Sequence, residues 1–478
     1  MFTLGIDSST QSVKALVYDV DAKKAVKTVS VNFGKDLPEF GSPDGFLPNA
    51  DPLVRAANPE MWLAGLDLVL KKLAAEFDTS LIAAIGGDGQ QHGSVYLGGS
   101  WTEALEKVRG KREEGRDKGL VEIFRGVYSR TVAPIWMDSS TGVEVKELDA
   151  RFPDMQKRTG SPAIERFTGP QIRKFAKTDP AGYAATKRIH LVSSFLCSVL
   201  CGADAPIDTG DGAGMNLLDL ATMKWAEDIV EFTAPGLLAK LPECRNGRAG
   251  SLAKYFERYG FRAGIPVAVF TGDNPASLVG TGADKPGVAV ISLGTSDVFF
   301  AAMDSFRTDP DGCGHVFGNP SGGCMSLACV KNGSLAREKV RALVGCDYKF
   351  FDELAFEEID ESTNRRIDES TNRRIDESTN RQIDESTNRQ ISSPCVPLFR
   401  GRNHAASSRD RNRGRFRLGE RDAGREGRLG HPRPGHEPLR ADALHRRLRR
   451  DPRDRRREPL ERNPRHDCRD FLRPRRDS

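Results

Sequence analysis

The chain has 478 residues, of which 38% are hydrophobic, and this is enough for two globular domains of ordinary size. Its formal net charge of +5 is unevenly distributed, because residues 401–478 contain 25 arginines, no lysine and 13 acidic residues, a net charge of +12. Residues 1–400 therefore carry −7, which is ordinary for an acidic enzyme and gives no reason to expect a nucleic-acid partner for the folded part.

The remaining composition argues against a secreted or membrane-bound protein. The start MFTLGID enters a strand at once, without a basic and apolar signal region, and no apolar run reaches the length of a membrane span. The nine cysteines lack the paired spacing of metal ligands, so we interpret them as buried, reduced thiols. These features predict a cytoplasmic location and no membrane partner; the oligomeric state stays open.

The first hydrophobic patterns predict an antiparallel sheet, with strands at residues 2–7, 13–20 and 25–31. Residues 59–77 have the broad apolar face of a helix, and residues 81–87 read as a buried strand. A strand edge at 206–209 and a second set of strands follow, at 265–272, 287–293 and 298–303, and residues 333–342 read as a further helix. This order predicts two α/β lobes.

Two hairpins present small hydroxyl residues where the strand reverses. LGIDSSTQSVKALVYD presents Asp7, Ser9 and Thr10, and ISLGTSDVFFAA presents Gly294 and Thr295. Glycine lets a backbone approach an anion, and hydroxyl and N–H groups donate to it. Two such hairpins across a cleft can hold the two ends of a triphosphate, which predicts an enzyme that uses ATP. Asp7 is also the expected carboxylate for a hydrated Mg²⁺, held through water.

Polar residues with catalytic potential follow other predicted strands. Asp211 lies in the glycine-rich segment GDGAG, where its carboxylate could accept a proton as a general base or could simply stabilise a turn. His92 in GQQHG, and Asp273 with Asn274 in GDNPAS, follow strands and suit a polyhydroxylated ligand, as does the planar donor set of Arg166. A structural role is the alternative for His92.

Two further side chains are left outside the predicted site. Trp136 in PIWMDSS is interpreted as a core residue rather than a residue that stacks on a ligand. For Lys14, which alternates outward along the second strand, a solvated position and a role at the site are equally supported.

Seven motifs in a fixed order resemble the FGGY carbohydrate kinases, and in detail the xylulose kinase branch found in animals. They lie between residues 1 and about 350: LGIDSSTQSVKALVYD, GQQHGSVY, PIWMDSSTG, ERFTGPQIRK, GDGAGMNLLDL, FTGDNPASLVGTG and SLGTSDVFF. The resemblance implies two ribonuclease-H-like lobes of the actin-like ATPase fold, with ATP and the sugar between them.

The resemblance also implies roles for the candidate residues. Asp211 takes the position of the catalytic base, and the expected substrate is D-xylulose, phosphorylated by ATP with Mg²⁺. The sugar contacts are His92, Arg166, Asp273 and Asn274, and the phosphate contacts are Asp7, Ser9, Thr10, Gly294 and Thr295. Three alternatives stay open: a kinase of the same family for another ketose or polyol, a non-catalytic sugar-binding protein on the same scaffold, and, less favoured, a sugar-independent ATPase.

The family pattern stops near residue 350. Residues 359–390 are two copies of IDESTNRR followed by two of IDESTNRQ, and a repeat of eight residues forms no apolar stripe on a helix. The glycine-rich loop that binds adenine in the family is missing after Gly345. We therefore expect an N-terminal lobe at 1–256, a truncated second lobe at 257–350, a low-complexity repeat at 351–398 and a disordered basic tail at 399–478. A tail with arginine but no lysine points to a gene read out of frame, with nucleic-acid binding as the charge-based alternative.

Overall fold

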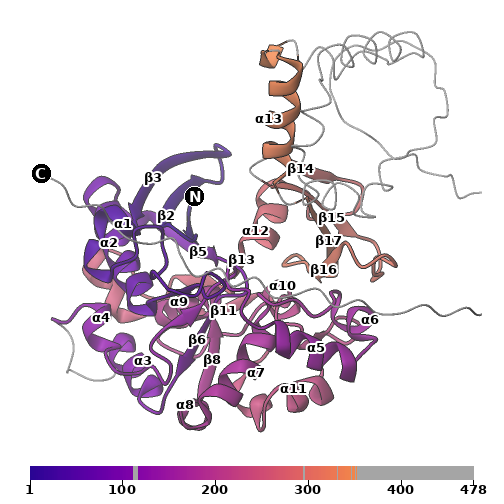
Figure 1. The fold of residues 1–478 in the computed structure, drawn as a ribbon. Coiled ribbons are helices and arrows are strands. Elements are labelled where there is room, and N and C mark those ends of the chain that lie inside the picture. The colour runs from indigo at the N-terminus through magenta and orange to yellow at the C-terminus, as the bar shows by residue number, and fades with distance from the viewer. Residues whose placement is uncertain (111–116, 294–295, 331, 346, 350, 352–478) are drawn as a thin grey trace, which may run out of the picture. The chain divides into compact units, whose positions relative to one another are not determined.

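The computed structural model describes residues 1–110, 117–293, 296–330, 332–345, 347–349 and 351 (Figure 1). The repeat, the basic tail and the predicted phosphate contacts Gly294 and Thr295 lie outside these residues. The strands are β1 (Phe2–Ser8), β2 (Ser12–Asp19), β3 (Lys24–Asn32), β4 (Ala56–Ala57), β5 (Ile82–Gly89), β6 (Ser94–Leu97), β7 (Ala133–Pro134), β8 (Arg188–Leu191), β9 (Leu218–Asp219), β10 (Lys224–Trp225), β11 (Arg248–Ser251), β12 (Pro266–Ala268), β13 (Thr271–Gly272), β14 (Ala289–Leu293), β15 (Asp297–Met303), β16 (His315–Gly318) and β17 (Cys324–Val330).

The α-helices of the described residues connect and cover these strands. They are α1 (Phe33–Asp36), α2 (Pro59–Glu76), α3 (Trp101–Arg109), α4 (Leu120–Ile123), α5 (Gly142–Arg151), α6 (Met155–Thr159), α7 (Thr168–Thr178), α8 (Pro180–Ala185), α9 (Val192–Cys201), α10 (Thr209–Ala213), α11 (Glu227–Thr233), α12 (Asp273–Gly280) and α13 (Gly333–Val344).

The large sheet has the order β11-β12-β5-β1-β2-β3, and β13 pairs with the end of β5. The predicted antiparallel start is confirmed, since β1 pairs with β2 and β2 with β3 in that sense. Strands β1, β12 and β13 all run parallel to β5. Their carboxyl ends consequently meet at one edge, where ligands bind in sheets of this kind.

The predicted helix at 59–77 is α2, and it covers this sheet. Asn58 caps its first turn by accepting the backbone N–H of Glu60, and Pro59 occupies the first helical position, where the absence of an N–H costs nothing. The buried face of α2 contributes Trp62, Leu66 and other apolar side chains to the same core as Val13, Ala15 and Val17 of β2. Burial of these side chains is the main force that holds helix and sheet together.

Two predicted strands are wrong in detail. The strand expected at 265–272 is divided into β12 and β13, because three residues lie between Val267 and Thr271 whereas two lie between their partners Ile85 and Asp88 on β5. The extra residue makes a bulge, and the buried ring of Phe270 packs over Gly87 there. The strand edge expected at 206–209 is reduced to one bridge between Ile207 and Cys244, because the chain turns at once into α10.

A second sheet with the order β14-β15-β17-β16 is antiparallel, and it confirms the strands predicted at 287–293 and 298–303. Its buried side chains include Phe300, Phe317 and Met325, which cluster with Phe167. The last residue of β16 touches α10 so closely that a Cβ on Gly318 would lie 2.4 Å from the backbone carbonyl carbon of Thr209. This contact requires glycine at position 318 and fixes α10 from one side.

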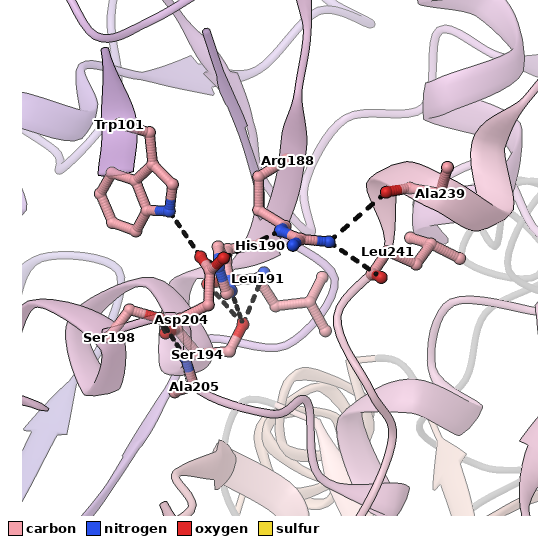
Figure 2. Close-up of polar contacts among 10 residues, drawn as sticks. All are labelled: Trp101, Arg188, His190, Leu191, Ser194, Ser198, Asp204, Ala205, Ala239 and Leu241. Atoms are coloured by element: carbon pink, nitrogen blue, oxygen red, sulfur yellow. Dashed lines mark hydrogen bonds and ion pairs between the residues drawn. The ribbon is translucent and has the colours of Figure 1, made fainter. Parts of the chain in front are cut away.

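A polar network around the partly exposed Asp204 side chain fixes β8 and α9 (Figure 2). Asp204 accepts hydrogen bonds from Trp101 Nε1 at 2.6 Å, His190 Nε2 at 3.2 Å and Arg188 Nε at 3.2 Å. Burial opposes ionisation, but the bonds from His190 and Trp101 and the charge of Arg188 hold the pKa of Asp204 well below its usual range. Because α9 begins two residues after His190, the network positions the first turn of α9, which carries Ser193.

The cysteines follow the sequence interpretation only in part. Cys197, Cys201 and Cys324 are buried free thiols, as expected. Cys329 is a free thiol but exposed, and Cys313 is disulfide-bonded, so a uniform set of buried reduced thiols is wrong. Within the described ranges, none of the helices has the length and apolarity needed to cross a bilayer.

Candidate active site

Three carboxylates meet at the edge of the large sheet where parallel strands end. Asp7 is the penultimate residue of β1, Asp88 is the penultimate residue of β5, and Asp273 follows β13 as the first residue of α12. Asp88 is in register with Asp7 on one side and with Thr271 on the other. The predicted placement of Asp7 and Asp273 at strand ends is therefore confirmed, and Asp88 joins them.

Asp211 lies in the first turn of α10, rather than in the irregular turn that the glycine-rich sequence predicts. The side chain of Asp208 caps this helix by accepting the N–H groups of Gly210 at 3.0 Å and Asp211 at 2.8 Å. It also accepts the hydroxyl of Thr271 at 2.8 Å, which ties α10 to β13. The cap replaces the turn because it satisfies N–H groups that would otherwise be buried without partners.

The Asp211 carboxylate is 1% exposed and is held on one side only. Ser193 donates its hydroxyl to Oδ2, while Oδ1 has no hydrogen-bond partner among the described residues. Burial, and then the neighbouring carboxylate of Asp208, raises the pKa of Asp211 well above its usual range. A buried carboxyl group with one unengaged oxygen and a raised pKa has the properties of a general base.

Asp211 and the Asp273 region are in contact across Gly272. A Cβ at position 272 would lie 2.6 Å from Asp211 Oδ1 and 2.3 Å from Gln91 Cγ, so only glycine fits there. Asn274 Nδ2 donates to Gln91 Oε1 at 2.8 Å, which joins α12 to the loop after β5. Burial raises the pKa of Asp273 to about 6. The structure thus brings Asp211, Asp273 and Asn274 together, as the sequence predicts.

His92 is buried and has the left-handed backbone conformation, with φ of 67°. Its Nδ1 lies 2.8 Å from the carbonyl oxygen of Gly214, and because a carbonyl only accepts, Nδ1 carries the hydrogen and Nε2 is left as an acceptor. Burial, and then the charge of Arg166, lowers the pKa of His92 to about 3. The ring is therefore neutral and stacks on Phe167 at 4.3 Å between centroids.

Arg166 lies in the segment before α7, next to this ring pair. Its guanidinium carbon is 5.7 Å from the centre of the Phe167 ring, and burial lowers its pKa. His92 and Arg166 thus belong to one cluster, joined through Phe167. Since α10 is followed directly by Gly214, the bond to His92 connects this cluster to the helix that carries Asp211.

The predicted phosphate turn joins β1 and β2 and differs from the expectation in one respect. Its reversal is formed by Ser9, Thr10 and Gln11 without a glycine, because Gly5 lies inside β1. The Ser9 hydroxyl lies 2.7 and 2.9 Å from the two carboxylate oxygens of Asp7 and donates to them. Lys14 Nζ lies 3.7 Å from Asp7 Oδ2, so Lys14 takes part in the site although half of its side chain is exposed.

Trp136 is not the core residue that its sequence suggests. Its side chain is 43% exposed, and its indole Nε1 donates to Thr10 Oγ1 at 2.8 Å. A tryptophan normally stabilises a fold by being buried. Because Trp136 is exposed and its indole N–H bonds to the β1–β2 turn, we interpret it as a residue that positions this turn. The hydrogen bond ties the segment that follows β7 to the β1–β2 turn.

The site residues fit a hydrated magnesium ion. Mg²⁺ takes hard oxygen ligands and usually combines one or two carboxylates with water and substrate phosphates. Asp7, Asp88 and the free Oδ1 of Asp211 supply such oxygens. Across the part of the chain that the structure describes, no three His, Cys, Asp or Glu side chains are grouped so that they could hold a metal ion by themselves.

Four residues of this site escape the sequence reasoning: Asp88, Gln91, Ser193 and Trp136. Burial, and then the adjacent Asp7 carboxylate, raises the pKa of Asp88 to about 9. The signal for Asp88 and Gln91 is present in the segment GGDGQQHG, because both flank the strand end that carries His92. For Ser193 nothing in the sequence indicates a contact with Asp211, since the two meet only because α9 and α10 both pack against β13.

Comparison with known proteins bears on the resemblance read from the motifs. Residues 131–280 match the N-terminal domain of the FGGY family of carbohydrate kinases, the family that the motifs resemble. Xylulose kinase 2 of Arabidopsis thaliana is 42% identical over 348 residues, and the match covers 71% of this chain and 61% of the relative.

Other relatives carry the same description. The xylulose kinase of Rattus norvegicus is 41% identical over 349 residues, which cover 71% of this chain and 63% of the relative. The crystal structure of a xyloylose kinase from Brucella ovis superposes with a TM-score of 0.61 at 25% identity, covering 75% of this chain and 67% of that one. The predicted carbohydrate kinase fold is thereby confirmed for the matched part. The chain spans somewhat more than three fifths of the length of the two curated relatives.

Proposed function

We propose that this protein is a sugar kinase that transfers the γ-phosphate of ATP to the 5-hydroxyl group of D-xylulose. The observation that carries the proposal is Asp211, a buried carboxyl group with a free Oδ1 beside the sugar-binding candidates Asp273 and Asn274. The similarity to xylulose kinases supports the choice of sugar.

The reaction assigns one proton transfer to the protein. The 5-hydroxyl oxygen attacks the γ-phosphorus, its proton passes to Asp211 Oδ1, and ADP leaves as the bond from the γ-phosphorus to the bridging oxygen breaks. Ser193 keeps the carboxyl group oriented through Oδ2. Mg²⁺, when bound, neutralises charge on the phosphates, with Asp7 as the carboxylate that holds it through water.

The other candidate residues bind and orient the substrates. Asp273 accepts hydrogen bonds from sugar hydroxyl groups, the neutral His92 offers Nε2 as an acceptor, and the Arg166 guanidinium donates. On the phosphate side, the turn with Ser9 and Thr10 donates to phosphate oxygens. Gly294 and Thr295 are proposed for the opposite end of the triphosphate.

The proposal is tested with two proteins, the full chain and a restored chain in which residues 1–350 are followed by the C-terminal segment of the Arabidopsis relative. Each is incubated with ATP, Mg²⁺ and a panel of D-xylulose, D-ribulose, glycerol and gluconate. We expect phosphorylation of D-xylulose at its 5-hydroxyl group by the restored chain, detected by ³¹P NMR.

Each alternative function has its own outcome in this experiment. Preferred turnover of another sugar identifies a kinase for that ketose or polyol. Sugar binding without phosphorylation by either protein identifies a non-catalytic sugar-binding protein. ATP hydrolysis that does not depend on sugar identifies an ATPase and contradicts the proposal.

A further inference from the structure

Asn246 lies in the loop before β11, and its side chain continues a ladder of backbone hydrogen bonds. The N–H of Ile207 donates to the carbonyl oxygen of Glu243 at 3.0 Å, and the N–H of Arg245 donates to the carbonyl oxygen of Ile207 at 2.9 Å. The chain then leaves this ladder because α10 begins at Thr209. The next hydrogen bonds are made to a side chain, since the N–H and the hydroxyl of Thr209 donate to Asn246 Oδ1 at 2.9 and 3.0 Å. Asn246 thus satisfies an N–H group that has no partner within the helix.

The other end of the same amide reaches the second sheet. Asn246 Nδ2 donates to the carbonyl oxygens of Asn319 at 3.0 Å and Pro320 at 3.2 Å, the two residues that follow β16. Because carbonyl groups only accept and the N–H of Thr209 only donates, these partners determine the orientation of the amide. Asn319 is itself fixed, since it is 1% exposed and its Nδ2 donates to the carbonyl oxygen of Asp284 at 2.8 Å. One side chain therefore connects the start of α10 to a fixed point of the second sheet.

This connection adds direction to a contact that is otherwise made by packing. Gly318 and Thr209 already touch, with no room for a Cβ at position 318. Dispersion attraction between packed atoms depends on distance, whereas a hydrogen bond also depends on angle. The four bonds of the Asn246 amide therefore fix the orientation of α10 relative to the end of β16 as well as its distance from it.

The orientation of α10 matters for the proposed reaction because the groups involved lie on different elements. Asp211, the proposed base, is the third residue of α10. The proposed phosphate contacts Gly294 and Thr295 follow β14, which belongs to the same sheet as β16. Transfer requires reacting atoms about 3–3.5 Å apart, and a misplacement of about 1 Å can reduce the rate by roughly 10². The base must consequently keep its position relative to the second sheet.

We infer that Asn246 is a positioning residue for phosphoryl transfer, whose amide sets Asp211 relative to the sheet that leads to the phosphate contacts. This inference rests on the proposed function. It goes further because it assigns the alignment of the base to a side chain outside the sugar and phosphate contacts. Since Asn246 acts through α10 rather than on a substrate, its loss should lower kcat and leave sugar affinity nearly unchanged.

Hydrogen exchange in the full chain tests the connection without catalysis. Asn246→Asp keeps an oxygen that accepts from Thr209 and replaces the two N–H donors by an acceptor, whereas Asn246→Ala removes both halves of the amide. By mass spectrometry we expect residues 315–323 to exchange about fivefold faster or more in both variants. Residues 209–213 should exchange faster only in Asn246→Ala. The matched control Asn49→Asp, at an exposed asparagine before β4, should exchange as the wild type does.

Kinetics of the restored chain test the consequence for catalysis. Both Asn246 variants should lower kcat about tenfold or more. Calorimetric titration with D-xylulose should give an affinity within about threefold of the wild type, because the sugar contacts are unchanged. The titration should also give the wild-type stoichiometry, which excludes an unfolded fraction as the cause of the lower kcat.

The outcomes separate this inference from the proposed function. Unchanged exchange at residues 315–323 in both variants overturns the connection, and normal kcat in Asn246→Asp overturns the role of the second sheet in positioning the base. A loss of sugar stoichiometry that matches the loss of kcat shows a purely structural role and also overturns the inference. If the wild-type restored chain phosphorylates no sugar, the proposed function fails and the role of Asn246 in it fails too, while the exchange result still shows whether the connection exists.

Discussion

Replacement of Asp211 by Asn is the sharpest test of the proposed chemistry. Asparagine has the same shape as aspartate, and its oxygen can still accept the Ser193 hydroxyl that now reaches Oδ2. Its amide nitrogen then takes the place of Oδ1, where it donates and cannot accept a proton. The change therefore removes the base while the α10 cap formed by Asp208 persists.

The size of the effect follows from this single loss. A positioned general base contributes about 10²–10⁴ in rate, so Asp211→Asn in the restored chain should reduce kcat by that factor, or roughly 3–5 kcal/mol of barrier. D-xylulose affinity should change little, because Asp273, Asn274 and His92 are untouched. The assay is steady-state ADP formation together with calorimetric titration of the sugar.

The pH dependence provides a second readout for the same variant. The pKa of Asp211 is raised in the folded protein, so the carboxyl group is protonated at low pH and becomes a competent base as the pH rises. We expect kcat/KM of the restored chain to increase with pH and that of Asp211→Asn to lack this increase. A variant that retains near-normal turnover, or the wild-type pH profile, would refute the assignment of Asp211 as the base.

Three further predictions concern other residues. Asp273→Ala should weaken calorimetric D-xylulose binding by about 1–3 kcal/mol, the cost of leaving hydroxyl groups unpaired, and unchanged affinity would remove Asp273 from the sugar site. Trp136→Phe removes the bond to Thr10, worth about 0.5–1.5 kcal/mol, so KM for ATP in the restored chain should rise roughly 2–12-fold with kcat nearly constant; an unchanged KM contradicts the positioning role. Asp204→Asn should destabilise the full chain in urea at pH 7 by about 1–3 kcal/mol. Because the pKa of Asp204 is lowered by folding, the difference in unfolding free energy between wild type and Asp204→Asn should shrink as the pH falls below about 4, the ordinary pKa of Asp. A difference in unfolding free energy that does not depend on pH argues against the charged network.

The parts of the fold that the sequence predicts are those in which a repeating pattern decides the structure. Strand β2 alternates buried and exposed residues, β1 alternates buried and partly buried ones, and the broad apolar face of α2 allows only a helix against that sheet. The bulge between β12 and β13 is not predictable in this way, because it depends on Phe270 filling the space above Gly87, more than 180 residues away. Local patterns contain no information about such a contact.

The same distinction applies to the site. Asp7, His92 and Asp273 stand at the ends of predicted strands, so a rule about parallel sheets places them at one edge. Trp136 shows where such rules fail, since composition favours burial of tryptophan whereas its exposure here follows from a hydrogen bond to a distant turn. The contact of Ser193 with Asp211 likewise depends on how α9 is held by Asp204 and His190, which no spacing in the sequence reveals.

The last prediction concerns the arginine-rich tail, which we expect to be a shifted reading of the missing adenine-binding segment. The second sheet leaves apolar side chains exposed on β14 and α13, with Ile291 at 59%, Leu293 at 65% and Leu335 at 55%, a surface that further globular sequence would cover. Residues 451–459, DPRDRRREP, can be encoded so that reading one nucleotide later gives Ile-Leu-Ala-Thr-Gly-Gly-Ala-Ser, a glycine-rich loop of the expected kind. The slip would lie between about residue 356 and residue 402, where the repeat of eight residues is prone to unequal copying. As written, the chain should bind ATP negligibly, and restoring the shifted frame should restore ATP binding. Sequencing the gene decides the matter, because stop codons in the shifted frame, or the absence of a glycine-rich loop opposite Arg455–Arg457, would require that the tail be explained as protein.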